Sequence, residues 1–302
     1  GIIISEYGVE GLVQRKYKTG IEIISLEAIK NFMKAWGHPW GMGGIEKRFS
    51  DHETKSAFGK QLIVKDNETL VINSAENNFI VEKFLMGKNS IIKFEEDVKE
   101  LNIVALTASF GKGAQIDGRG WNGQDGRSGS MGNSNYGSNC GDGGNGGSGD
   151  NGEGGYNGVR ITLKMGISKI DGLVIDLDGG RGGGGGSGGK GGSGGGGSSA
   201  TDGCQPGDGG NGGRGGNGGN GGNGGNLRID YFFLDKQEKE LSASDILIYV
   251  EPGNGGAAGS GGGTGSGGNG PSGMKDGKSG NYGNSGNSGR PGRVGNQVLI
   301  KI

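Results

Sequence analysis

The apolar residues gather in short stretches that alternate with polar positions, and each stretch has the length of a β-strand. Four stretches precede residue 118, and the others follow glycine-rich tracts. This spacing is typical of an all-β sheet or solenoid, which would supply a compact apolar base. The predicted strands are 61–64, 69–72, 91–94, 101–106, 159–163, 173–177, 227–233, 246–250 and 297–302.

The N-terminal part, residues 1–60, has a different pattern. Ser25 can cap a helix, and the apolar residues that follow fall on one face of that helix. The face suits a core, while large residues at its end and in the loop beyond are candidates for docking on another protein. The face consists of Leu26, Ile29, Phe32, Met33 and Trp36, and the candidate docking residues are Trp36, Trp40 and Met42.

Glycine dominates the rest of the chain, with 79 of 302 residues, of which 12 precede residue 118. The glycines keep a spacing of three over long runs, in three blocks that are each interrupted once. A flexible linker has no reason to keep glycine in phase, whereas a polyproline-II-type helix repeats every three residues. We therefore predict six rods, 118–132, 143–158, 179–198, 209–226, 253–268 and 277–292.

These rods determine the predicted fold class. Polyproline-II geometry forms no internal hydrogen bonds, so buried rods must bond to one another across bare glycine faces. We expect a mainly β protein with a polyglycine-II bundle, in which three glycine-rich hairpins (six rods) project from a β-strand base, with a small α/β N-terminal part. The rods 179–198 and 209–226 should lie centrally. The expected domains are 1–60 (N-terminal part), 61–117 (β-strand base) and 118–302 (glycine-rich polyglycine-II domain).

Charge and composition exclude several classes of function. The formal net charge is −1 at pH 7 without a basic cluster, so we expect no nucleic-acid partner. No run of 18 apolar residues occurs, so we expect no membrane insertion. The chain has two histidines and no recognisable Ser/His/Asp or Cys/His set. We therefore predict a protein that is not an enzyme and has no catalytic residues, no metal ion and no cofactor.

The two cysteines, Cys140 and Cys204, fall at matching places in the interruptions of the first two glycine blocks. If the two hairpins stand side by side, these residues can form a disulfide at the hairpin tips, which implies an oxidising or external setting. Two free or buried thiols are an equally good interpretation, because the sequence gives no distance between them.

The three interruptions, 133–142, 199–208 and 269–276, contain chemically varied residues, whereas the rods are mostly Gly, Asn and Ser. Such variety is typical of binding loops, and Tyr, Asn, Ser and Gly are used by adaptable recognition surfaces. The same residues also form turns. The candidate receptor-binding residues are Asn135, Tyr136, Asn139, Thr201, Asp202, Gln205, Pro206, Pro271, Met274, Lys275 and Asp276.

In its in-phase glycines, its Gly-Gly-Asn triplets and its interspersed loops, the segment 118–302 resembles the tail-fibre tip adhesins of T-even-type bacteriophages. The resemblance implies a polyglycine-II sandwich with receptor-binding loops at its far end. It also implies a cell-surface receptor, either an outer-membrane protein or a glycan, and an extracellular or virion-surface location. A small attachment domain would then join a fibre or another structural protein.

Three other interpretations of the glycine pattern remain. A purely structural bundle would have tips without function. An ice-binding protein also uses bundled glycine-rich helices, but it needs a flat face of small, mildly apolar side chains, and the Asn row of 209–226 is strongly polar. The third interpretation is a disordered RNA-binding protein of the RGG type. Such proteins have many RGG boxes and a net positive charge, whereas this neutral block has two boxes, 181–183 and 214–216.

Overall fold

A computed structural model describes residues 56–135, 140–198, 203–234 and 240–302 of the chain. The predicted N-terminal helix and the docking residues Trp36, Trp40 and Met42 lie outside these residues. The regular secondary structure of these residues consists of β-strands. They contain no helix that is long and apolar enough to cross a membrane. The strands are β1 (Ser56–Val64), β2 (Thr69–Ile72), β3 (Asn78–Met86), β4 (Ile91–Phe94), β5 (Glu100–Phe110), β6 (Ala114–Asp117), β7 (Arg160–Ile170), β8 (Leu173–Asp176), β9 (Leu227–Phe233), β10 (Ile246–Tyr249) and β11 (Gln297–Lys301).

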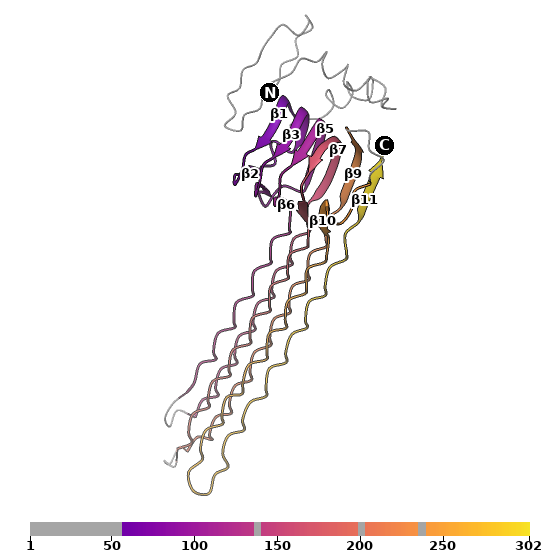
Figure 1. The fold of residues 1–302 in the computed structure, drawn as a ribbon. Coiled ribbons are helices and arrows are strands. Elements are labelled where there is room, and N and C mark those ends of the chain that lie inside the picture. The colour runs from indigo at the N-terminus through magenta and orange to yellow at the C-terminus, as the bar shows by residue number, and fades with distance from the viewer. Residues whose placement is uncertain (1–55, 136–139, 199–202, 235–239) are drawn as a thin grey trace, which may run out of the picture.

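Successive strands alternate between two parallel sheets. The larger sheet has six strands in the order β1-β3-β5-β7-β9-β11, and the smaller has five in the order β10-β8-β6-β4-β2. Each strand pairs with the strand two positions along the chain, so the chain winds through one coil for each pair of strands. This is a two-sheet solenoid, and Figure 1 shows its coils stacked side by side from β1 to β11.

The core lies between the two sheets because alternate residues of each strand point inward. Leu62, Phe84, Ala108 and Ile167 occupy one register position in four successive strands of the larger sheet, and all are buried. Phe84 also packs edge to face against Phe110, with ring centroids 5.4 Å apart. Stacking of equivalent apolar residues therefore holds neighbouring coils together.

The turns from the larger to the smaller sheet repeat one backbone geometry. Asn67, Asn89, Gly113 and Gly172 all have positive φ at the same corner of successive coils. Asn and Gly tolerate this region better than other residues. The side-chain amide of Asn89 also donates to Asn67 Oδ1 over 3.2 Å, which fixes the spacing between the first two coils.

The sequence-based strand predictions are confirmed in part. The strands at 69–72, 91–94 and 227–233 have the predicted bounds. The other predicted strands are present with shifted ends, and β5 and β7 are longer than predicted. Two strands, β3 and β6, were not predicted at all.

The predicted fold class was wrong. Two parallel sheets of six and five strands organise the described residues, and these residues include no helix. The glycine-rich segments are neither helix nor strand, and the structure does not show the predicted polyglycine-II hairpin bundle. The physical reason is that these segments are long insertions in successive coils of the solenoid. They are not an independent bundle standing on a small base.

The insertions extend the pairing of the sheets. We call 118–132, 179–198 and 253–268 the outgoing segments, because they follow β6, β8 and β10, and we call 143–158, 209–226 and 277–292 the returning segments. Asp117 lies opposite Asp176 in the smaller sheet. Bonds from Gly120 N to Asp178 O and from Asn135 N to Ser193 O, 2.8 and 2.9 Å long, keep the same register to the far end. In Figure 1 the segments run away from the sheets side by side.

Three alternate triplets of the middle returning segment, 209–226, satisfy their backbone donors in three different directions. In the triplets that end at Asn211, Asn217 and Asn223, one N–H bonds to the next returning segment, one to an outgoing segment, and one to an Asn side chain of the preceding returning segment. Full satisfaction of backbone donors is what a buried extended chain requires. The first triplet has the bonds Gly209 N to Lys278 O (2.7 Å), Gly210 N to Gly192 O (2.8 Å) and Asn211 N to Asn145 Oδ1 (2.8 Å).

The asparagines of the returning segments form ladders. Asn151 Oδ1 accepts the backbone N–H of Asn217, and Asn217 Oδ1 in turn accepts the backbone N–H of Asn287, each over 2.8 Å. An Asn side chain thus replaces the acceptor that the neighbouring backbone cannot supply. The Gly-Gly-Asn triplet is therefore a structural unit, with two glycines for close approach and one Asn for lateral bonding.

Candidate functional site

The described residues of the three interruptions, 133–135, 140–142, 203–208 and 269–276, lie at the end of the molecule that is remote from the sheets (Figure 1). Gly197 N donates to Asn269 O over 2.9 Å, which joins the end of the outgoing segment 179–198 to the third interruption. A methyl group on Gly197 would lie 2.9 Å from Pro206 Cγ and 3.0 Å from Pro271 Cδ, so both proline rings pack on this glycine. The three loops therefore form one cluster, which we call the loop cluster.

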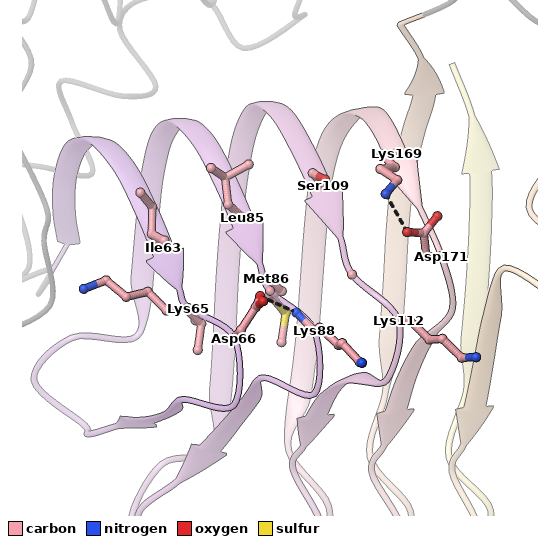
Figure 2. Close-up of a pocket in the computed structure, with 13 residues that line it drawn as sticks. Ile63, Lys65, Asp66, Leu85, Met86, Lys88, Ser109, Lys112, Lys169 and Asp171 are labelled. Atoms are coloured by element: carbon pink, nitrogen blue, oxygen red, sulfur yellow. Dashed lines mark hydrogen bonds and ion pairs between the residues drawn. The ribbon is translucent and has the colours of Figure 1, made fainter.

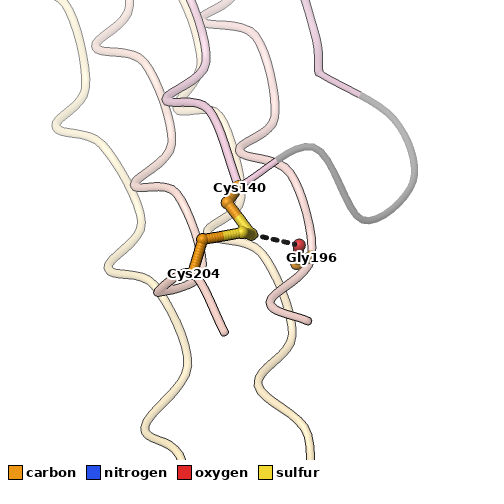
Figure 3. Close-up of a disulfide and its surroundings, with 3 residues drawn as sticks. All are labelled: Cys140, Gly196 and Cys204. Atoms are coloured by element: carbon orange, nitrogen blue, oxygen red, sulfur yellow. Dashed lines mark hydrogen bonds between the residues drawn. A yellow bond between two sulfur atoms is a disulfide. The ribbon is translucent and has the colours of Figure 1, made fainter. Parts of the chain in front are cut away.

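A disulfide joins the first two loops. Cys140 and Cys204 are bonded, with their Cα atoms 5.8 Å apart (Figure 3), as their matching positions in the sequence allowed. Cys140 has φ of 48°, and its Sγ lies 3.4 Å from Gly196 O. The two cysteines are 64 residues apart in sequence, so the disulfide links two loops that are otherwise connected only by the long glycine-rich segments.

The described candidate residues of the first two loops differ in their environment. The side-chain amide of Asn135 donates to Asp142 O, so this side chain closes its own loop. Pro206 is buried, whereas Gln205 is exposed. Among these residues, Gln205 offers its polar group to solvent, and Asn135 and Pro206 mainly shape the surface. Tyr136, Asn139, Thr201 and Asp202 lie outside the described residues.

The third loop is a tight turn. Met274 N donates to Pro271 O over 2.9 Å, and Gly273 takes φ of 93°, which favours glycine. Asp276 Oδ1 accepts the backbone N–H of Gly270 over 2.6 Å, so its carboxylate closes the loop. Lys275 is exposed, and Met274 is half-buried. The cluster thus presents a cation, an amide and a thioether on a rigid backbone.

A second charged group lies where the sheets meet the outgoing segments. Arg119 Nε is 2.8 Å from Asp117 and 3.6 Å from Asp176. Burial raises the pKa of Asp117, but the hydrogen bond and charge of Arg119 outweigh it and hold this pKa below its ordinary value. Burial, together with the charge of Asp178, raises the pKa of Asp176. This arrangement ties two coils together.

A groove of about 770 Å³ runs along the ends of β1, β3, β5 and β7 and the turns that follow these strands. Its charged lining does not converge on one point. Figure 2 shows Lys65 extending away from Lys88 and Lys112, and Lys169 pairs with Asp171 over 2.6 Å. No group of three potential metal ligands occurs among the residues that the structure describes. The groove is therefore a weaker candidate site than the loop cluster.

Sequence reasoning missed the roles of two sets of residues. The asparagines of the returning segments were interpreted as a polar face, although their oxygens bond the neighbouring backbone. The exposed side chains of Trp121 and Tyr156 were not considered, although both stand out from segments that are otherwise small and polar. An aromatic residue inside a glycine repeat was the signal that could have revealed the second set.

Comparison with known proteins gives little. No protein-family model matches the chain, and no curated protein matches it. Among solved structures, a springtail antifreeze protein from Granisotoma rainieri, described as a nine polyproline type II helical bundle, is 23% identical. The match covers 54% of this chain and 93% of the other. Its TM-score is 0.12, so the similarity carries no argument about fold or function.

Proposed function

We propose that this chain is a non-enzymatic adhesin that recognises a cell-surface receptor through the loop cluster. The observation that carries the proposal is that three varied loops, distant in sequence, are held together at the end remote from the sheets. Rigid backbone around exposed, varied side chains lowers the entropy cost of binding. Long lateral ladders of hydrogen bonds hold this surface away from the sheets.

The partner that fits this surface is exposed on a cell, either an outer-membrane protein or a glycan. The disulfide supports an extracellular or virion-surface location, because such bonds persist in oxidising surroundings. Attachment of the N-terminal part to a fibre or another structural protein belongs to the same proposal. The proposal includes no catalysis, nucleic acid or cofactor.

The test is the binding of labelled protein to a panel of bacterial strains. The test variant carries Gln205→Ala, Met274→Ala and Lys275→Ala, which remove side chains but keep the disulfide, both prolines and Asp276. The matched control carries Lys278→Ala, Tyr282→Ala and Arg290→Ala, three exposed residues of a returning segment. The adhesin proposal predicts selective binding by the parent and the control, with loss in the test variant.

A structural role is the second candidate, because the ladders of backbone and Asn bonds would suit a spacer with inert tips. In that case neither the parent nor either variant binds any strain. Equal binding by the parent and the test variant would place recognition outside these three side chains and would contradict the adhesin proposal as stated.

A further inference from the structure

The outgoing segment 118–132 and the returning segment 143–158 form one edge of the glycine-rich part. They run antiparallel, and backbone N–H groups of the second donate to carbonyls of the first. These bonds pair residues of the two segments at intervals of three along the chain. The paired residues are Tyr156 with Trp121 (N to O, 2.8 Å), Glu153 with Gln124 (2.9 Å), Asp150 with Arg127 (2.8 Å), and Gly147 with Ser130 (2.8 Å).

The pair nearest the sheets is aromatic and open to solvent. Trp121 is 53% exposed and Tyr156 is 46% exposed. Neither ring is in contact with another aromatic ring of the described residues. Two large rings at this edge expose apolar area outside the buried core.

Polar residues lie next to this aromatic pair along the edge. Glu153 is one triplet from Tyr156 on the same segment, and its backbone partner Gln124 adds an exposed amide. Glu96 and, to a smaller extent, Glu153 raise the pKa of the Tyr156 phenol. The edge therefore combines two aromatic residues with an amide and carboxylates.

We propose that this edge, centred on Trp121 and Tyr156, binds a neutral glycan. One face of a pyranose ring carries C–H groups, which are attracted to the negative face of an aromatic ring. The hydroxyl groups around the sugar donate to carboxylates and exchange hydrogen bonds with an amide. This site is separate from the loop cluster, and it would give the chain a second contact with a glycan-coated surface.

The charge of the edge selects among glycans. Glu96 and Glu153 lie beside the rings, and Asp150 follows along the edge with Arg127 as its paired neighbour. Carboxylates close to the ligand repel uronic acids and other anionic sugars. A neutral chain therefore fits this edge better than an acidic one.

The test is isothermal titration calorimetry of the full chain with three probes: cellohexaose, chitohexaose and an oligogalacturonide of the same length. At least one neutral probe should bind, and the acidic probe should bind more weakly. We expect Trp121→Ala and Tyr156→Ala each to weaken the binding of the neutral probe about ten-fold or more. Tyr282→Ala, which removes a 79% exposed ring from another segment, is the matched control and should bind like the parent.

Three results would overturn the proposal: no heat of binding with either neutral probe, unchanged binding by Trp121→Ala, or tighter binding of the acidic probe. Because Trp121 and Tyr156 are exposed, both variants should keep the parent's melting temperature, and this measurement accompanies the titrations. The loop-cluster variant of the cell assay should bind the glycan normally, so failure of this proposal and failure of the adhesin proposal are distinguishable.

Discussion

Replacing Gly213 by Ala tests how closely the glycine segments approach one another. Gly213 is buried in the returning segment 209–226, and a methyl group there would lie 2.5 Å from the carbonyl carbon of Gly147. Gly147 O would lie still closer, and ordinary contact begins at 3.4 Å, so the two returning segments must move apart by at least about 1 Å. Both neighbours are backbone atoms, which cannot rotate away as a flexible side chain does.

The cost follows from the hydrogen bonds at this point. Gly213 N bonds to Gly189 O, Gly189 N bonds to Gly147 O, and Gly262 N bonds to Gly213 O, each over 2.8 Å. A net value of about 1 kcal/mol for each bond gives about 3 kcal/mol if all three are lost. The lower entropy of an unfolded Ala chain offsets about 0.4–1 kcal/mol of this. We expect a net loss of about 2–3 kcal/mol and a Tm lower by roughly 4–12 °C.

Gly154 provides the matched control. A methyl group there would find one atom within 4 Å, Asn220 O at 3.6 Å, so Gly154→Ala should leave the Tm unchanged or slightly raised. Gly154→Asn should raise the Tm further by adding about 1 kcal/mol to the free energy of unfolding. Asn151 and Asn157 accept backbone N–H groups on either side of this position, and an Asn at 154 could do the same. The assay is thermal unfolding followed by calorimetry. Equal melting of Gly213→Ala and Gly154→Ala would refute the close-approach argument.

Three more predictions concern other parts of the molecule. Asn217→Ala should lower the free energy of unfolding by about 1 kcal/mol in denaturant titration, because the backbone N–H of Asn287 loses its acceptor. The double variant Cys140→Ser and Cys204→Ser should lower the free energy of unfolding by up to about 4 kcal/mol, the chain-entropy value for a loop of this length. Thiol titration should find no free thiol in the unreduced parent. Asp176→Asn should raise the Tm at pH 7 but not at pH 3, because burial raises the folded-state pKa of Asp176 above its ordinary value and the carboxylate is unfavourable only when it is ionised. An equal effect at both pH values would contradict this.

Local pattern was enough to find most strands but not their arrangement. The alternation in 69–72, 91–94 and 227–233 was readable because each stretch is apolar and bounded by turn residues. β6 has four residues, two of them polar, and offers little periodicity. Parallel pairing joins residues far apart, such as Asp117 and Asp176, and no local pattern encodes such partners. The regular spacing of the glycines is a local signal. The predicted fold class relied on it and therefore missed the two parallel sheets.

The candidate site was predictable in outline. The matching positions of Cys140 and Cys204 allowed either a disulfide between neighbouring loops or two free or buried thiols, and the structure contains the disulfide. The roles of single side chains were not readable, because Asp276 and Asn135 bond backbone groups within their own loops. A polar residue in a turn looks the same in sequence whether it faces a receptor or closes the loop.

The most direct test of the central claim is hydrogen–deuterium exchange of the protein with and without the envelope of a strain that it binds. Recognition through the loop cluster predicts added protection in peptides that cover 203–208 and 269–276, with the sheets and the middle of the glycine segments unchanged. Protection confined to the sheets, or absence of protection in the loop cluster with bound envelope, would contradict the account.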